Sequence, residues 1–137
     1  MPDREAPSVP GVESIVEWFG TWPSFSDAEV IEISLLRRAR SSVVVHVWRM
    51  TSEVDPKGYY VTDHHAVVTV WLEGISDLSL QDFSVQNVIG GLSIDRQGSV
   101  YRVSLRSLFG IGGHIDAERV SLSLQPGRPK DAVRAEA

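Results

Sequence analysis

Trp22-Pro23-Ser24-Phe25-Ser26-Asp27-Ala28-Glu29 is the stretch at which the apolar pattern of this chain changes. Before it, apolar residues recur at helical spacing, and after it they alternate with polar residues. Pro23 prevents the preceding helix from continuing. The run therefore joins a helix to a sheet, where its aromatic residues can pin one to the other and its acids can line a site.

A short helix is predicted ahead of this run. Val12, Ile15, Val16 and Phe19 have the spacing of a helix with one apolar face. Gly20 follows directly and is typical of a helix end. We expect the helix to pack on the sheet through this apolar face.

Strands are predicted from period-two alternation in the rest of the chain. Apolar residues alternate with polar ones where one face of a strand lies in a core. Short polar connections and the lack of long helical patterns favour antiparallel pairing. The predicted strands are residues 31–35, 43–48, 68–73, 88–94, 101–106, 115–117 and 120–125, while residues 78–83 fit either a helical turn or an edge segment.

These patterns predict an α+β fold that is mainly antiparallel β. About seven strands form a curled sheet or a sandwich-like arrangement, with one short N-terminal helix packed on it. The 137 residues fit a single domain, which we place at residues 11–126. Residues 1–10 carry three prolines and residues 127–137 are largely polar, so we expect a flexible arm and a flexible tail.

The composition is that of an ordinary soluble globular protein. Hydrophobic residues make up 42% of the chain and charged residues 23%, which allows a real core. There is no cysteine, which excludes disulfides and thiolate chemistry. No apolar run reaches the ~18 residues of a membrane span, and the charged N-terminus does not resemble a secretion signal. We therefore expect a cytoplasmic protein with no membrane partner.

Acidic charge is concentrated at one end of the chain. Seven of the 18 acids lie in residues 1–32 with a single base, Arg4, whereas the rest of the chain holds 11 acids and 12 bases. An acidic face disfavours nucleic acid as a partner and suits a basic protein, which it attracts over distance. The alternative is a solvated acidic surface without a partner.

Catalytic chemistry has weak support in the sequence. The four histidines lack metal-binding spacing, and the adjacent pair, His64 and His65, would face opposite sides of a strand. No serine lies in a Gly-x-Ser-x-Gly elbow, and Asp27 and Glu29 lie too near each other on one edge to flank a bond. We therefore expect no catalytic residue, no metal and no cofactor.

Two short motifs carry a resemblance to a known family. The first is Phe19-Gly20-Thr21-Trp22-Pro23-Ser24-Phe25-Ser26-Asp27-Ala28-Glu29-Val30, and the second is Phe83-Ser84-Val85-Gln86-Asn87-Val88-Ile89. Both resemble the immunity protein 50 family, small antidote proteins of bacterial polymorphic toxin systems. Ser26 departs from the family pattern, which often has histidine there. The resemblance implies a non-enzymatic protein that binds a cognate toxin domain and blocks it.

An acidic toxin-binding surface around the first motif follows as a hypothesis. Many toxin domains are basic nucleases, and acidic groups can mimic the phosphates of their substrate. Asp27 and Glu29 are equally consistent with a wholly structural motif. The predicted toxin-binding residues are Glu13, Glu17, Trp22, Asp27, Glu29 and Glu32.

Two other functions also fit the sequence. A small-ligand or metal-binding β-protein with hydrolytic activity would have a pocket formed by the curled sheet, and bound metal would favour it. A self-associating structural subunit would use an exposed sheet face, and a concentration-independent monomer would exclude it. The residues concerned are His64, His65, Asp27 and Glu29 for the pocket, and Trp48 and Trp71 for the sheet face, unless the helix covers these tryptophans as core.

Overall fold

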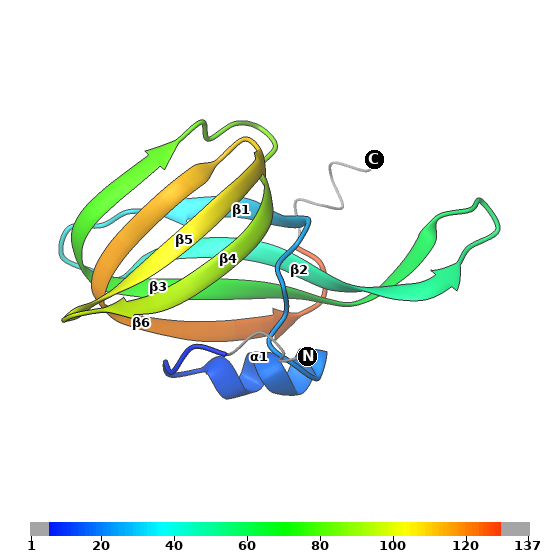
Figure 1. Cartoon of the computed structure of the whole chain (residues 1–137), viewed down its shortest axis with the longest axis horizontal. Coiled ribbons are helices and arrows are strands. Elements are labelled where there is room, and N and C mark those ends of the chain that lie inside the picture. The colour runs from blue at the N-terminus through cyan, green and yellow to red at the C-terminus, as the bar shows by residue number, and fades with distance from the viewer. Residues whose placement is uncertain (1–5, 130–137) are drawn as a thin grey trace.

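A computed structural model of the chain describes residues 6–129, which form one helix and six antiparallel strands. The strands make one sheet that closes into a barrel in the order β1-β2-β3-β6-β5-β4 (Figure 1). The predicted fold, mainly antiparallel β with a short N-terminal helix, is confirmed. Its elements are α1 (Val12–Phe19), β1 (Ala28–Ser34), β2 (Ser41–Val54), β3 (Tyr60–Gln81), β4 (Val88–Gln97), β5 (Val100–Phe109) and β6 (Gly112–Pro126).

The strand count differs slightly from the prediction because two predicted strands are one. Residues 115–117 and 120–125 both belong to β6, which pairs with β3 along its whole length. Residues 78–81, for which two interpretations were open, continue β3 as a strand. β1 meets β4 through two register pairs, so the curled sheet closes on itself.

Alternating valines fill the interior of the barrel. Val43, Val45 and Val47 of β2 face Val68 and Val70 of β3 or their neighbours, and all five are at most 2% exposed. Full burial of a side chain of this size contributes about 1.5–3 kcal/mol relative to exposure. The period-two pattern therefore identifies the inner face of these strands correctly.

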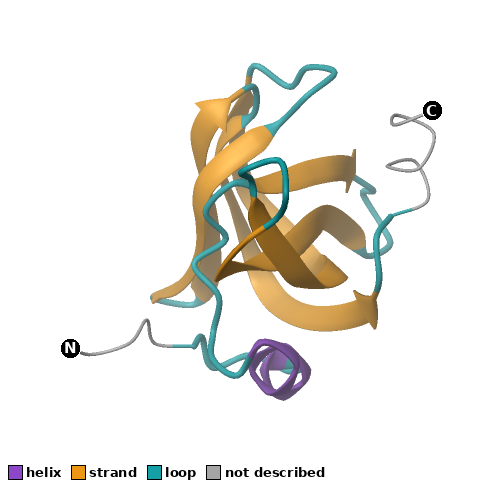
Figure 2. Cartoon of the chain, turned by 90° about the vertical axis from the view of Figure 1, so that its right-hand side faces the viewer, coloured by secondary structure: helices purple, strands orange, loops and turns teal. Residues whose placement is uncertain are grey.

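α1 packs against β6 and β3 at one side of the barrel (Figure 2). Its buried residues are Ile15 and Phe19, as the helical spacing predicts. Gly11 and Gly20 bound the helix with φ angles of 90° and 83°. A Cβ atom at Gly11 would lie 1.8 Å from the carbonyl oxygen of Leu122, so only glycine fits there. None of the helices in the described part of the chain is long and apolar enough to cross a membrane.

The two ends of the described chain lie close to the barrel. Val9 is buried, and the carbonyl of Pro10 accepts a 2.8 Å hydrogen bond from the Leu122 N–H. At the other end, the Gly127 N–H donates a 2.8 Å hydrogen bond to the carbonyl of His65. The rest of the predicted arm and tail, residues 1–5 and 130–137, lies outside the described residues.

Trp48 and Trp71 lie on the outer face of the sheet, where each is half-buried by neighbours. Trp71 donates a 3.0 Å hydrogen bond from Nε1 to Ser123 Oγ, and the Arg40 guanidinium lies 4.0 Å from the centroid of its ring. Trp48 packs against two histidines described below. The helix therefore does not bury them as core, and each has contacts within its own sheet.

Candidate functional site

The aromatic run, residues 22–29, packs its aromatic side chains into the protein. Trp22 and Phe25 are 5% and 2% exposed, and their ring centroids lie 5.3 Å apart. Phe25 has a φ of 60°, and its carbonyl accepts a hydrogen bond from the Ala28 N–H, which makes a tight turn into β1. Trp22, which was predicted to contact the toxin, is therefore buried and packs against Phe25 of the same run.

The aromatic run also covers one edge of the barrel. β4 pairs with β1 at only two positions, so the rest of β4 pairs with β5 alone. Residues 22–24 lie across a hollow of about 170 Å³ from residues 92–95 of this part. Leu92 and Ile94 point into the barrel interior, as their buried register partners Leu105 and Val103 do. Residues 28–29 of the run pair with residues 88–89 of β4, whereas residues 22–24 form no strand ladder with it. We call residues 92–95 of β4 the covered edge.

The predicted acids lie on two sides of the barrel. Glu13 and Glu17 are exposed on α1, which packs on β6 and β3. Asp27 and Glu32 are exposed and Glu29 is half-buried, all on or beside β1. β1 stands three places from β6 in the closed order of six strands. The structure therefore groups the β1 acids and separates them from the helix acids.

The second sequence motif contributes a buried amide. Asn87 is 3% exposed, and its Oδ1 accepts hydrogen bonds from the N–H groups of Ser84 at 2.8 Å and Ile111 at 3.1 Å. Its Nδ2 donates to the Ser84 carbonyl at 2.8 Å, and its own carbonyl accepts from the Val30 N–H at 2.9 Å. Asn87 thereby joins the β3–β4 loop, the turn before β6, and β1.

Two histidines far apart in the sequence form a hydrogen-bonded pair on β2 and β3. His46 Nε2 lies 3.0 Å from His65 Nδ1, and His65 Nε2 lies 3.0 Å from Thr62 Oγ1. The Trp48 ring packs against both imidazoles. Burial lowers the pKa of His65 from its usual value, and the nearby charge of Arg128 lowers it further. One imidazole of the pair therefore donates its N–H to the other, and burial disfavours the charged form of His65.

His64 faces away from this pair, as predicted for adjacent residues of a strand. Its ring packs against Trp18, and its Nδ1 lies 3.1 Å from Asp63 Oδ1. The hollow beside the two adjacent histidines contains neither Asp27 nor Glu29. The structure therefore does not assemble the pocket mouth that a ligand-binding function would require.

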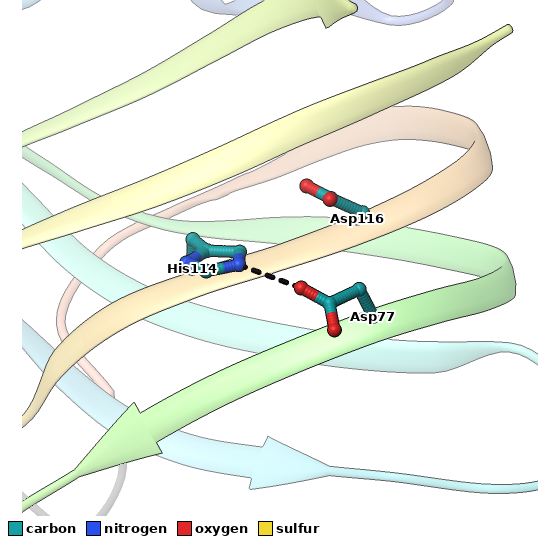
Figure 3. A group of neighbouring side chains, drawn as sticks. All are labelled: Asp77, His114 and Asp116. Carbon is teal, nitrogen blue, oxygen red and sulfur yellow. Dashed lines mark hydrogen bonds and ion pairs between the residues drawn. The ribbon is translucent and has the colours of Figure 1, made fainter.

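A group of three metal-ligating side chains lies on β3 and β6 (Figure 3). One ligand atom from each of Asp77, His114 and Asp116 lies within 4.8 Å of the others. His114 Nε2 is 3.0 Å from Asp77 Oδ2, whereas Arg102 donates two hydrogen bonds of 2.8 and 2.9 Å to Asp116. These bonds lower the pKa of Asp116. The three side chains are therefore held in two polar pairs, Asp77 with His114 and Asp116 with Arg102. Spacing in the sequence does not predict this group, because 37 residues separate Asp77 from His114.

β3 extends beyond its partner β2 and leaves an uncovered strand edge. β2 begins at Ser41, whose register partner is Leu72, so the following residues of β3 pair with β6 on one side only. In the described chain, no backbone group bonds to their other side. We call residues 73–81 the open edge; they form the arrowhead half of β3, the green arrow at the upper left of Figure 1.

Two adjoining hollows lie along the open edge. One of about 360 Å³ lies between residues 35–41 and residues 72–78, and one of about 290 Å³ lies between β1 and residues 80–83. Leu35 lines both. The sequence contains one signal of this surface, which is that residues 78–83 fit either a helical turn or an edge segment.

Comparison with known proteins identifies the family of the chain. A family model described as immunity protein 50 matches residues 11–124, from the start of α1 into β6, and includes both sequence motifs. No curated protein and no solved structure matches. The family match covers most of the chain, and the chain therefore belongs to the immunity protein 50 family.

Proposed function

We propose that this chain is an immunity protein that binds a cognate bacterial toxin domain in the cytoplasm and neutralises it without catalysis. The observation that carries the proposal is the family match over residues 11–124. This range contains α1 and nearly all of the barrel, so the whole fold is the unit to which the family's role applies.

In two Arg–Asp pairs on the outer face of the barrel, the two side chains bond to each other, so the carboxylates are not free to act in catalysis. This supports a binding role. Arg49 donates hydrogen bonds of 3.0 and 3.1 Å to Asp63, and these lower the pKa of that carboxyl group. Arg102 binds Asp116 in the same two-pronged manner. A general acid or base must instead be available to a substrate. Paired groups of this kind suit a stable binding surface.

The exposed acids have a role in this proposal that does not require direct contact. Electrostatic attraction between exposed charges extends over about 10 Å at 0.1 M salt. The acids of α1 and those of β1 can therefore speed the approach of a basic toxin domain from two sides. Trp22 contributes indirectly, because it holds the run that carries Asp27 and Glu29.

Co-expression with the toxin domain encoded beside its gene tests the proposal. We expect the chain to restore growth of cells that produce the active toxin domain, and a tagged toxin domain to retain the chain through purification. An empty vector and an immunity protein of another family are the controls. If the chain neither restores growth nor forms a complex, the proposal is wrong.

A further inference from the structure

We propose that the open edge, residues 73–81 of β3, is where the toxin domain docks, by adding an extended segment to the barrel as a further strand. This inference rests on the proposed function and adds to it the surface and the form of the bound segment. Three features carry it: an unpaired strand edge, hollows beside that edge that exposed leucines help to line, and arginines without an ionic partner.

The unpaired backbone is the first feature. β3 pairs with β2 only as far as Leu72, which leaves nine residues with β6 on one side and no strand on the other. Such an edge presents N–H and C=O groups that can pair with any extended chain. Strand addition to a sheet edge is a recurring mode of peptide recognition. A register shift lies between Ile75 and Asp77, so the regular part of the open edge is residues 77–81. A typical strand has about 5–6 residues, so this part can hold a short one.

The apolar side chains beside the edge are the second feature. Leu78 is the register partner of Ile115, which is 1% exposed, so both face the barrel interior. Leu78 is nevertheless 39% exposed, and Leu36 in the β1–β2 loop across the hollow is 52% exposed. Every second side chain of an added strand points to the same face. The two hollows can therefore receive alternate apolar side chains of the bound segment.

The charge beside the larger hollow is the third feature. Arg37 lines that hollow, Arg38 follows it in the same loop, and both are exposed. Neither forms an ion pair with any residue in the range 6–129. Guanidinium groups of this kind bind carboxylates well. The geometry therefore favours a toxin segment that carries acidic residues next to alternating apolar ones.

A second copy of this chain fits the open edge less well. Its own open edge contains two acids, Glu73 and Asp77, and these already contact Arg119 at 3.2 Å and His114 at 3.0 Å. Pairing two copies edge to edge would therefore bring no free carboxylate from that segment to the arginines of the loop. A segment from the toxin domain meets both the apolar and the charged requirement.

Titration of the full-length chain with a catalytically inactivated toxin domain tests the inference. Leu78→Asp and Leu36→Asp place a charge on either side of the larger hollow, at positions that are already exposed. Val54→Asp is the matched control, because Val54 is 57% exposed at the end of β2, whereas the hollow lies at the start of that strand. We expect the Kd to rise by about 30-fold or more for the two leucine variants and to stay unchanged for the control.

Growth rescue and sedimentation separate the outcomes. If wild type protects cells and both leucine variants bind as tightly as wild type, the inference is wrong and the proposed function stands. If wild type neither protects nor binds, both are wrong. A wild-type dimer that the two variants convert to monomers without loss of toxin binding would assign the edge to a second copy and overturn the inference. If Leu78→Asp does not fold, as judged by circular dichroism, Leu36→Asp decides alone.

Discussion

The covered edge of β4 and the open edge of β3 arise in the same way but end differently. Each strand continues past its pairing with a neighbour, β4 past β1 and β3 past β2. Residues 22–24 lie beside the covered edge, where Leu92 and Ile94 are 6% and 8% exposed. In the described chain no segment lies on the open edge, where Leu78 is 39% exposed.

This difference indicates that the open edge is more than a by-product of strand length. An uncovered apolar strand edge favours aggregation, and proteins usually protect it. The aromatic run shows that this chain can protect such an edge with a short irregular segment. The second edge has two acids and a register shift, but in the described chain no segment lies over it, as expected of a surface that a partner completes.

The largest expected effect comes from truncating Phe25, whose ring packs against Trp22 of the segment beside the covered edge. Phe25 is 2% exposed, so Phe25→Ala should lower the free energy of unfolding by about 3–5 kcal/mol in a denaturant titration. Phe83, beside the open edge, is 58% exposed, and Phe83→Ala should change it by less than about 0.5 kcal/mol. Equal effects of the two substitutions would contradict the distinction between the two edges.

The next effect concerns Asn87, which joins elements near both edges. Asn87→Ala removes the acceptor for the buried Ile111 N–H, which should lower the free energy of unfolding by about 1–3 kcal/mol. Asn87→Asp keeps the acceptor but sets a second carboxylate oxygen against the Ser84 carbonyl at a buried position, so it should also lower the free energy of unfolding. Urea titrations of the three proteins provide the measurement, and wild-type stability of Asn87→Ala would show that this amide does not hold the β3–β4 loop.

A smaller effect distinguishes the rate of association with the toxin domain from the stability of the docked complex. Asp27→Lys with Glu32→Lys should slow association with the toxin domain by about tenfold at low salt and much less at high salt, because steering is screened. The dissociation rate should stay the same, since neither residue lies on the open edge. Stopped-flow kinetics measures both rates; unchanged association at low salt, with the fold intact, would remove the steering role.

The smallest effect is a pH dependence that involves neither edge. Burial lowers the pKa of His65, so the unfolded chain binds this proton more readily than the folded chain. The free energy of unfolding should be highest at pH values above the usual histidine pKa of about 6.5. It should fall as the pH drops below that value. His65→Gln should reduce this fall, as measured by denaturant titrations on either side of that pKa. An identical pH profile for the variant would contradict the role assigned to the His46–His65 pair.

Local patterns in the sequence predicted the helix and the inward faces of the strands, but not the full length of β3. Helical spacing identified Ile15 and Phe19 as the buried face of α1, and period two identified the inward valines of β2. Both predictions succeed because burial on one face imposes a period on neighbouring residues.

The open edge and the position of the acids depend on long-range register, which leaves no local period. The edge exists because Ser41, the first residue of β2, pairs with Leu72. The nine residues of β3 that follow Leu72 therefore have no partner in β2. The predicted acidic surface is divided because α1 packs on β6 rather than beside β1. Trp22 illustrates the same limit, since aromatic content alone does not distinguish an exposed contact from a buried support.

Hydrogen–deuterium exchange of the chain, alone and bound to its inactivated toxin domain, tests the central claim most directly. Exchange reports which backbone N–H groups gain hydrogen bonds or burial in the complex. We predict that protection increases at residues 73–81 and in the β1–β2 loop at residues 35–40, and stays constant at residues 22–29. Increased protection at residues 22–32 with no change at residues 73–81 would contradict the claim and assign the toxin contact to the acidic side of the barrel.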